Sequence, residues 1–396
     1  MEQVRFGIVG LGNQGTHYNA LIQDGKVPGG IVSAYCDIDP LRIDTMKGKS
    51  KFTDAAYFDD YDKMLDSGLI DAVLVETPHY LHPEMTIKAL KRGLGVICDK
   101  PAGVYAKQVT EMIDFAKTVN APFAMMFNQR TNCIYRKMRE MIADGKIGSL
   151  QRVNWIITDW YRTQTYYDSG SWRATWNGEG GGVLFNQCPH QIDLVYWIIG
   201  ELPKTVRGYC QYGRWHDIEV EDEVTAYFEY ENGATGVFIT TTGETPGTNR
   251  LEISGTKGKL LCENNKLFFY ENAVDGIENI KTSTNGFARP EFTVTEVETD
   301  GLNEQHAGIL KNFVNYMLGK EELFVAGTDG LASVELMDAI QFSGWTGETV
   351  TIPVDPDRYL AILNEKRANG RQKAHVSSAV ADTAGTFGSG NNGGNK

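Results

Sequence analysis

Short apolar runs alternate with helical patterns over the first 125 residues of the chain. The apolar runs cover residues 4–10, 31–37, 72–76, 95–99 and 122–127. Apolar residues recur at helical spacing between them, over residues 17–23, 40–47, 61–65, 83–91 and 106–118. Short buried strands that alternate with helices indicate a parallel sheet covered on both faces. The pattern therefore predicts a doubly wound Rossmann sheet in this part of the chain.

The pattern of the second half favours longer strands joined by hairpins. Strand-like segments cover residues 150–159, 205–210, 224–230, 235–242, 250–254 and 259–263. Helical patterns cover residues 134–144, 191–199, 308–318 and 330–343. Asn232-Gly233 between two strand-like segments is a strong hairpin signal. We expect an open, mainly antiparallel sheet with helices on one face, whose other face packs against a second subunit in a homo-oligomer.

These patterns divide the chain into three parts. Residues 1–126 are expected to form the cofactor-binding domain, and residues 127–368 a domain for substrate binding and oligomerisation. From residue 369 large apolar side chains become scarce, and the end of the chain is rich in Gly, Asn and Ser. That composition is typical of a flexible tail.

Composition excludes several classes of protein. The 396 residues carry a net charge of −13, which disfavours binding to nucleic acid or to anionic membranes. The six cysteines form no CxxC pair, so we expect buried free thiols and a reducing compartment. We see no signal-peptide pattern and no run of about 18 apolar residues, so the expected location is the cytoplasm.

A glycine-rich turn follows the first predicted strand and opens a helix. Residues 10–15 read Gly-Leu-Gly-Asn-Gln-Gly, which matches the G-x-G-x-x-G fingerprint in the context that it requires. Gly10 would form the tight turn, Gly12 would let the backbone approach a pyrophosphate, and Gly15 would allow close packing of the helix. The residues between them that would face the cofactor are Asn13 and Gln14.

Asp37 ends the second predicted strand, 22 residues after Gly15. A carboxylate there accepts hydrogen bonds from the adenosine ribose and repels a 2′-phosphate, so NAD is the expected cofactor. Arg42 leaves NADP open, because a guanidinium attracts phosphate. A flavin uses the same fingerprint, but the sequence offers no further flavin signal.

Three further segments complete a set of motifs in a definite order. They are Glu76-Thr77-Pro78 followed by His82, then Asp99-Lys100-Pro101, and then the run from Gly180 to Asp193 that contains Asn186 and His190. With the glycine fingerprint, this set resembles the glucose–fructose oxidoreductase / inositol dehydrogenase / MocA (Gfo/Idh/MocA) family. The resemblance covers about residues 4 to 360, and it is specific for the family and not for a substrate.

The resemblance implies roles for the residues of the second motif. Asp99 would contact the nicotinamide ribose and Lys100 would point at the reacting hydroxyl, with a cis peptide bond before Pro101. The family usually has glutamate where this chain has Asp99, so the reach is shorter by one methylene. A lysine ammonium stabilises a developing alkoxide. The cofactor would also be lined by Thr77, Pro78, His82 and Asn128.

His190 is the best candidate for the general acid or base, because the ordinary pKa of histidine lies near neutral. The family usually has aspartate where this chain has Asn186, and an amide cannot take up a proton. Asp193 lies one helical turn after His190 and would orient its ring or bind substrate, or would be a plain helix aspartate. We expect His190 within a few ångströms of Lys100 and of the nicotinamide, at the cleft between the two domains.

A segment rich in aromatic residues and arginine precedes the His190 motif. Aromatic faces stack on the C–H faces of sugars, and arginines bind hydroxyls or carboxylates. The alternative is that these residues only pack at an interface. The candidate substrate-binding residues in it are Trp160, Arg162, Trp172, Arg173 and Trp176, together with Lys100, Asn186 and His190.

The leading hypothesis is an NAD-dependent oxidoreductase acting on a secondary hydroxyl or ketone of a sugar, glycoside or cyclitol. One alternative is an NAD-dependent glycosidase that oxidises the sugar transiently at C3, eliminates the aglycone and re-reduces the sugar. A second alternative is a non-catalytic sensor with an NAD fold. His79 and His82 are spaced for one helix face, but nothing completes a metal set, so no metal is expected. The sequence does not identify the sugar or the carbon that is oxidised.

Overall fold

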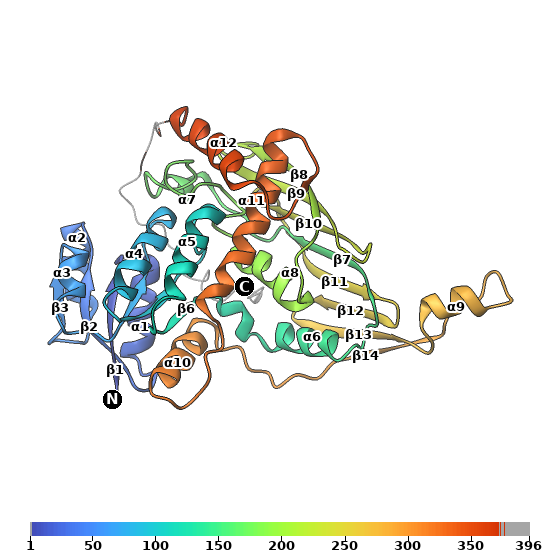
Figure 1. Cartoon of the computed structure of the whole chain (residues 1–396), viewed down its shortest axis with the longest axis horizontal. Helices are drawn as coiled ribbons and strands as arrows, with labels where there is room; N and C mark the ends of the chain where they lie inside the picture. The colour runs from blue at the N-terminus through green and yellow to red at the C-terminus, as the bar shows by residue number, and fades with distance from the viewer. Residues whose placement is uncertain (1, 372, 374–375, 377–396) are drawn as a thin grey trace. The chain divides into compact units, whose positions relative to one another are not determined.

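The computed structural model describes residues 2–371, 373 and 376, and it contains two compact units (Figure 1). The first contains residues up to Thr131, the short stretch Gly178–Gly180, and Glu304–Val334. The second contains Asn132–Asn177, Gly181–Asn303 and the chain from Glu335 onward. Most of the segment from residue 369, expected to be a tail, lies outside the described residues.

The first unit is built on a six-stranded parallel sheet with strand order β3-β2-β1-β4-β5-β6. The strands are β1 (Val4–Val9), β2 (Gly30–Cys36), β3 (Ala56–Phe58), β4 (Ala72–Val75), β5 (Gly95–Cys98) and β6 (Phe123–Met125). The helices are α1 (Asn13–Gln23), α2 (Pro40–Lys49), α3 (Tyr61–Leu65), α4 (His82–Leu90), α5 (Ala106–Ala116) and α10 (Gln305–Met317). The predicted doubly wound sheet is confirmed. The short strand β3 lacked a sequence signal, since all three of its residues are only half-buried.

The carboxyl ends of the central strands carry the predicted cofactor residues. Val9 pairs with Cys36 and with Val75, and Val75 pairs with Cys98. The residues that follow these strands are Gly10, Asp37, Glu76 and Asp99. In a parallel sheet such residues lie along one edge, which is where ligands of open α/β sheets bind.

A late segment of the chain completes the first unit. In α10, Phe313 packs 6.4 Å from the ring of Phe6 in β1. Ala326 forms a bridge with Ala124 in β6. Helical spacing predicted α10, but nothing in the local sequence of residues 304–334 shows against which sheet they pack.

The second unit is built on a nine-stranded sheet with strand order β14-β13-β12-β11-β7-β10-β9-β8-β15. Its strands are β7 (Leu150–Ile157), β8 (Thr205–Tyr212), β9 (Glu221–Glu229), β10 (Thr235–Thr241), β11 (Asn249–Gly255), β12 (Gly258–Glu263), β13 (Lys266–Asn272), β14 (Phe292–Glu296) and β15 (Val350–Thr351). The pair β7–β10 is parallel and the other pairs are antiparallel. The prediction of a mainly antiparallel sheet is confirmed.

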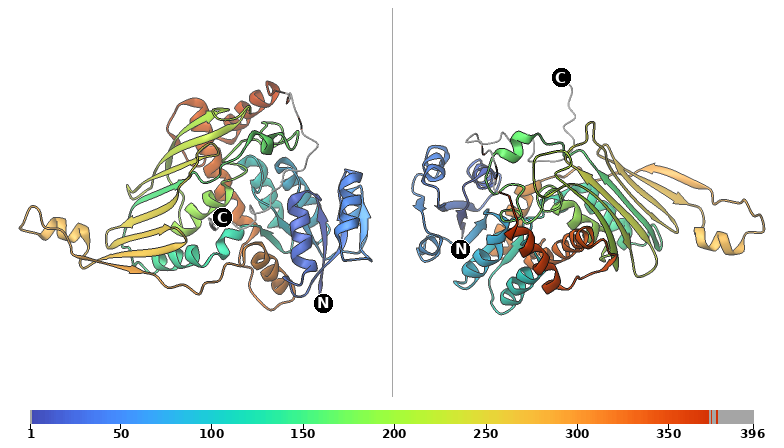
Figure 2. Two further views of the ribbon diagram at one scale, coloured as in Figure 1. Left: turned by 180° about the vertical axis from the view of Figure 1, so that it is seen from behind. Right: turned by 90° about the horizontal axis from the view of Figure 1, so that it is seen from above.

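Helices pack on one face of this sheet (Figure 2). They are α6 (Cys133–Ala143), α8 (Pro189–Ile199) and α11 (Gly330–Thr346, which begins in the first unit). The other helices are α7 (Gln164–Asp168), α9 (Gly276–Thr282) between β13 and β14, and α12 (Pro356–Ala368), whose Tyr359 contacts Trp345 of α11. Trp155 of β7 is buried and contacts the ring of Tyr135 in α6 at 6.0 Å. The residues of β9 alternate between buried Ala226 and Phe228 and exposed Tyr227, so the opposite face of the sheet is open in this chain.

Three strands of this sheet, β13, β14 and the two-residue β15, were missed in the sequence. Asn264 and Asn265 both have positive φ, 52° and 57°, and form the turn between β12 and β13. Asparagine tolerates this conformation, so an Asn-Asn pair after a strand signals a hairpin. The strand β14 reads Phe-Thr-Val-Thr-Glu, a short alternation of apolar and polar residues, and all five of its residues are exposed.

No helix in the described part of the chain has both the length and the apolar character needed to cross a membrane. The six cysteines are free; Cys36, Cys98 and Cys188 are buried as expected, whereas Cys133, Cys210 and Cys262 are half-buried.

Candidate functional site

The glycine turn after β1 leaves no room for side chains at two of its three glycines. Gly10 has a φ of 91°, and a Cβ there would lie 2.3 Å from the carbonyl oxygen of Glu76. A Cβ on Gly15 would lie 2.2 Å from the carbonyl oxygen of Gly10. Gly12 has no other atom within 4 Å of that position. The open space at Gly12, beside the N-terminus of α1, fits a dinucleotide pyrophosphate approaching the first helical N–H groups, those of Asn13 and Gln14 included.

Asp37 holds the same turn from the neighbouring strand. One oxygen of its carboxylate accepts the N–H of Leu11 at 2.7 Å, and the other accepts the N–H of Asp39 at 2.9 Å. Each carboxylate oxygen can accept a second hydrogen bond. Asp37 therefore fits the ribose role expected for it and also fixes the glycine turn.

Ionisable side chains lie close together at the carboxyl ends of the parallel strands. Both carboxyl oxygens of Glu76 are shielded from solvent, and burial together with the neighbouring Asp99 carboxylate raises the pKa of Glu76 well above its ordinary value. Burial and the same two acids also raise the pKa of Tyr18 in α1. Lys100 is half-buried beside them, and its backbone N–H donates to the Asp99 carboxylate at 2.8 Å.

His82 joins two turns of the first unit. Its Nδ1 lies 2.7 Å from the carbonyl oxygen of Pro101, and its Nε2 lies 2.7 Å from the carbonyl oxygen of Thr77. The Lys100–Pro101 peptide bond is cis, which confirms that prediction. His82 thus ties the Thr77-Pro78 turn to the Lys100-Pro101 turn, and burial lowers its pKa.

Residues of α10 and its N-terminus border the same group. The side-chain amide of Asn128 donates to the Gln305 amide oxygen at 2.7 Å. Burial lowers the pKa of His306 to about 3, with contributions from His17 and Lys100. The rings of His17 and His306 lie 5.2 Å apart. His17 and His306 were not singled out in the sequence, because 289 residues separate them and neither belongs to a motif.

In the second unit, a tight turn leads into α8 and carries two of the predicted catalytic residues. The N–H of Asn186 donates to the Gly182 carbonyl at 2.9 Å, and the N–H of Cys188 donates to the Val183 carbonyl at 2.9 Å. Pro189 then begins α8, so His190 lies in its first turn. Asp193 is buried on the same helix, three residues later.

Within the aromatic and arginine segment, which runs from Trp160 to Trp176, Tyr166 contacts both predicted arginines, Arg162 and Arg173. Its hydroxyl contacts Asn186 at 3.0 Å and accepts from Arg173 at 3.1 Å. The guanidinium groups of Arg162 and Arg173 lie 5.2 and 4.7 Å from the Tyr166 ring, within cation–π distance. The other aromatic partners of these arginines are Trp160 at 5.7 Å and Trp172 at 4.6 Å.

Trp176 packs in a different place. It is buried, and its ring contacts Tyr212 at 5.9 Å and Trp345 at 5.8 Å, with the Lys366 ammonium 5.1 Å from it. This setting favours a packing role for Trp176 over the predicted role in binding a substrate.

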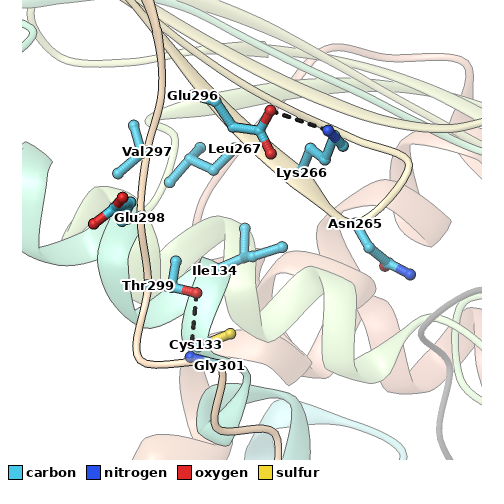
Figure 3. Close-up of a pocket in the computed structure, with 10 residues that line it drawn as sticks. All are labelled: Cys133, Ile134, Asn265, Lys266, Leu267, Glu296, Val297, Glu298, Thr299 and Gly301. Atoms are coloured by element: carbon cyan, nitrogen blue, oxygen red, sulfur yellow. Dashed lines mark hydrogen bonds and ion pairs between the residues drawn. The ribbon is translucent and has the colours of Figure 1, made fainter.

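The second unit contains a cavity of about 500 Å³ (Figure 3). It is lined by residues of α6 and of the β13–β14 region, and Lys266 and Glu296 form an ion pair of 3.0 Å in its wall. None of its lining residues is a predicted site residue. Within the described residues no group of three or more His, Cys, Asp or Glu side chains is arranged to hold a metal.

Comparison with known proteins agrees with this geometry. The oxidoreductase family model described as an NAD-binding Rossmann fold matches residues 4–127, and the model of the GFO/IDH/MocA C-terminal domain matches residues 135–261. Inositol 2-dehydrogenase of Rhizobium meliloti (strain 1021) is 24% identical over 344 residues, which cover 85% of this chain and 95% of that protein. D-glucoside 3-dehydrogenase of Escherichia coli (strain K12) is 25% identical over 318 residues, which cover 76% of this chain and 85% of that protein.

A solved structure shows the same overall similarity. The WlbA dehydrogenase from Bordetella pertussis, crystallised with NADH and UDP-GlcNAcA, superposes with a TM-score of 0.72 at 26% identity, covering 89% of this chain and all of that one. The first unit is thus an NAD-binding Rossmann domain, and the chain belongs to the GFO/IDH/MocA oxidoreductase family.

Proposed function

We propose that this chain is an NAD-dependent dehydrogenase that interconverts a secondary hydroxyl and a ketone on a sugar, glycoside or cyclitol. The observation that supports it most is the Tyr166–Asn186 contact, which brings the aromatic and arginine segment to the turn that leads into His190. An NAD-binding unit and a polar, aromatic-rich unit are the two parts that such a reaction needs.

Each proposed catalytic residue has one task. Bound NAD supplies the hydride acceptor for oxidation. His190 takes the proton of the hydroxyl as general base. The Lys100 ammonium stabilises the negative charge that develops on the oxygen. Asn186 orients the hydroxyl by hydrogen bonding, and Asp193 holds the His190 ring.

The substrate class is inferred from the Tyr166 group and from the relatives. Arg173 carries N–H donors suited to hydroxyls or carboxylates, and Trp160 and Trp172 offer aromatic faces to C–H groups. The relatives act on an inositol or a glucoside, and the solved structure holds a nucleotide sugar acid. We further propose that the protein works in the cytoplasm as a homo-oligomer, without nucleic acid or membrane partners.

The test is NAD⁺ reduction, followed at 340 nm, against myo-inositol, methyl glucosides and UDP-GlcNAcA. We expect turnover of at least one compound, and Lys100→Met should lower kcat on the order of 100-fold or more while NADH binding persists. Aglycone release from a glycoside without net NADH would instead favour the redox-neutral glycosidase. Bound NAD with no turnover of any compound would overturn the proposal.

A further inference from the structure

One residue, Glu221 at the start of β9, holds the glycine turn that precedes Asn186 and His190. Its carboxyl oxygen Oε1 accepts the N–H groups of Gly182 at 2.8 Å and Leu184 at 3.3 Å. Its backbone carbonyl accepts the N–H of Val183 at 2.9 Å. Three consecutive N–H groups of the turn therefore bond to a single residue that lies 37–39 positions further along the chain.

The turn also lies directly against the β9 backbone. A Cβ on Gly182 would lie 2.0 Å from the Glu221 carbonyl oxygen, so only glycine permits this approach. A Cβ on Gly181 would lie 2.4 Å from the ring of Phe185. Because neither position tolerates a side chain, the turn has little freedom to settle elsewhere on the strand.

Hydrogen bonds connect this anchor to the proposed catalytic residues step by step. Gly182, held by Glu221, accepts the N–H of Asn186, and Val183 accepts the N–H of Cys188. Cys188 in turn accepts the N–H of Ile192 at 2.9 Å, in the first turns of α8 that include His190. A shift of the anchored turn would therefore move Asn186 and His190 with it.

Further hydrogen bonds, through Gln341 and Tyr359, hold the Glu221 carboxyl itself. Its second oxygen accepts the side-chain amide of Gln341 at 3.4 Å, and the Gln341 amide oxygen accepts the Tyr359 hydroxyl at 2.5 Å. Glu221 is fully buried, and burial raises its pKa to about 7, against the opposing effect of its hydrogen-bond donors. The titratable groups in electrostatic contact with it are Cys210 and Tyr212 of β8 and Lys366 of α12.

We propose that Glu221 is a positioning residue for the proposed reaction, which sets the location of Asn186 and His190 by holding the turn at residues 182–184. The roles of Asn186 and His190 in this inference rest on the proposed function. Glu221 itself would touch neither the substrate nor the cofactor.

A first measurement needs no substrate. The protein has seven histidines, so the ring signals of histidine-labelled protein can be resolved by NMR, and His190→Gln identifies the His190 signal by its loss. Glu221→Gln keeps an acceptor oxygen in place and should leave that signal unmoved. Glu221→Asp withdraws the carboxyl by one methylene and Glu221→Leu removes it, so both should move the signal.

The matched control is Glu219→Gln. Glu219 lies two residues away and accepts the N–H of Trp176 at 2.8 Å, not those of the glycine turn. This variant should leave the His190 signal in place. An unmoved His190 signal in folded Glu221→Asp would overturn the proposal. If Glu221→Leu does not fold, the comparison of Glu221→Asp with Glu221→Gln still tests it.

Activity gives the second measurement, with the compound of the sugar panel that is turned over fastest. Glu221→Asp should lower kcat about tenfold with the KM for NAD⁺ within twofold of wild type, and Glu221→Gln should retain at least half of kcat. A moved signal with unchanged kcat would overturn the positioning role. If no compound of the panel is turned over, the proposed function fails, and the NMR result still shows whether Glu221 holds the turn.

Discussion

The Tyr166 hydroxyl and the Asn186 amide oxygen lie 3.0 Å apart, and Arg173 donates to the same hydroxyl at 3.1 Å. With Arg173 donating to it, the hydroxyl is free to donate its own proton to Asn186. Gln187 also donates to the Asn186 oxygen, at 3.1 Å. The amide of Asn186 is therefore oriented with its oxygen toward the Tyr166 and Gln187 donors.

Removing the Tyr166 hydroxyl should weaken sugar binding. In Tyr166→Phe the ring stays, but Arg173 loses an acceptor and Asn186 loses a donor, a loss of about 1 kcal/mol. We expect the KM for the sugar to rise roughly five- to tenfold with the KM for NAD⁺ unchanged. Tyr161→Phe, at a residue that is half exposed, is the control. Equal kinetic constants for the two variants would remove Tyr166 from the substrate site.

The two hydrogen bonds of Asp37 sharpen the test of cofactor choice. Asp37→Ala removes the repulsion of a 2′-phosphate and also leaves the Leu11 N–H without its acceptor. It should therefore weaken the binding of NAD while it improves the binding of NADP. Asp37→Asn keeps an acceptor for the Leu11 N–H and removes the charge, at the loss of the acceptor for the Asp39 N–H. We expect Asp37→Asn to raise the ratio of kcat/KM for NADP to that for NAD about tenfold or more. Wild-type preference for NADP would contradict the assigned role.

The sequence predicts those residues whose role depends only on their neighbours along the chain. Gly10, Gly12 and Gly15 are fixed by the turn itself, and the apolar runs gave the central parallel strands, because burial on both faces leaves a continuous apolar pattern. Glu221 was not predicted, because its role depends on a turn almost forty residues away. His306 was not predicted either, since only the fold of residues 304–334 brings it to His17.

The raised pKa of Glu221 also predicts how stability changes with pH. Its folded value of about 7 exceeds its ordinary value of 4.5, so the folded chain keeps a proton that the unfolded chain releases in that window. The free energy of unfolding should therefore fall as pH rises from about 4.5 to 7. The contribution of this one group is of the order of 3 kcal/mol.

Glu221→Gln carries no such proton and isolates the effect. The melting temperature of wild type relative to Glu221→Gln should decrease between pH 5 and pH 7 and level off above that range. Differential scanning fluorimetry of both proteins in the same buffers measures this difference. Parallel pH curves for the two proteins would show that Glu221 does not titrate in this window.

The open face of the nine-stranded sheet predicts self-association. Tyr209 of β8 is 55% exposed and Tyr227 of β9 is 39% exposed, both on strands whose alternate residues are buried. Light scattering should give a mass that is a multiple of that of one chain, and Tyr227→Asp should shift it toward the monomer. Leu41→Asp, on an exposed position of α2 in the first unit, should leave it unchanged. A monomeric mass of the wild type at micromolar concentration would contradict the prediction.

The last prediction concerns Lys100 and His190, which are proposed to act on the same hydroxyl. If His190 removes the proton and Lys100 stabilises the resulting charge, either residue alone achieves little, because the stabilised charge forms only when the proton leaves. The losses in kcat for Lys100→Met and His190→Ala should then be far from additive, and the double variant should be about as slow as the slower single variant.

A double-mutant cycle on kcat measures this coupling, with NADH binding by fluorescence as the check that each variant keeps its fold. His190→Ala should also regain part of its rate at alkaline pH, where hydroxide replaces the base, whereas Lys100→Met should not, because hydroxide supplies no positive charge. Two independent losses that multiply in the double variant would mean that the residues act in separate steps, and the proposed mechanism would then be wrong.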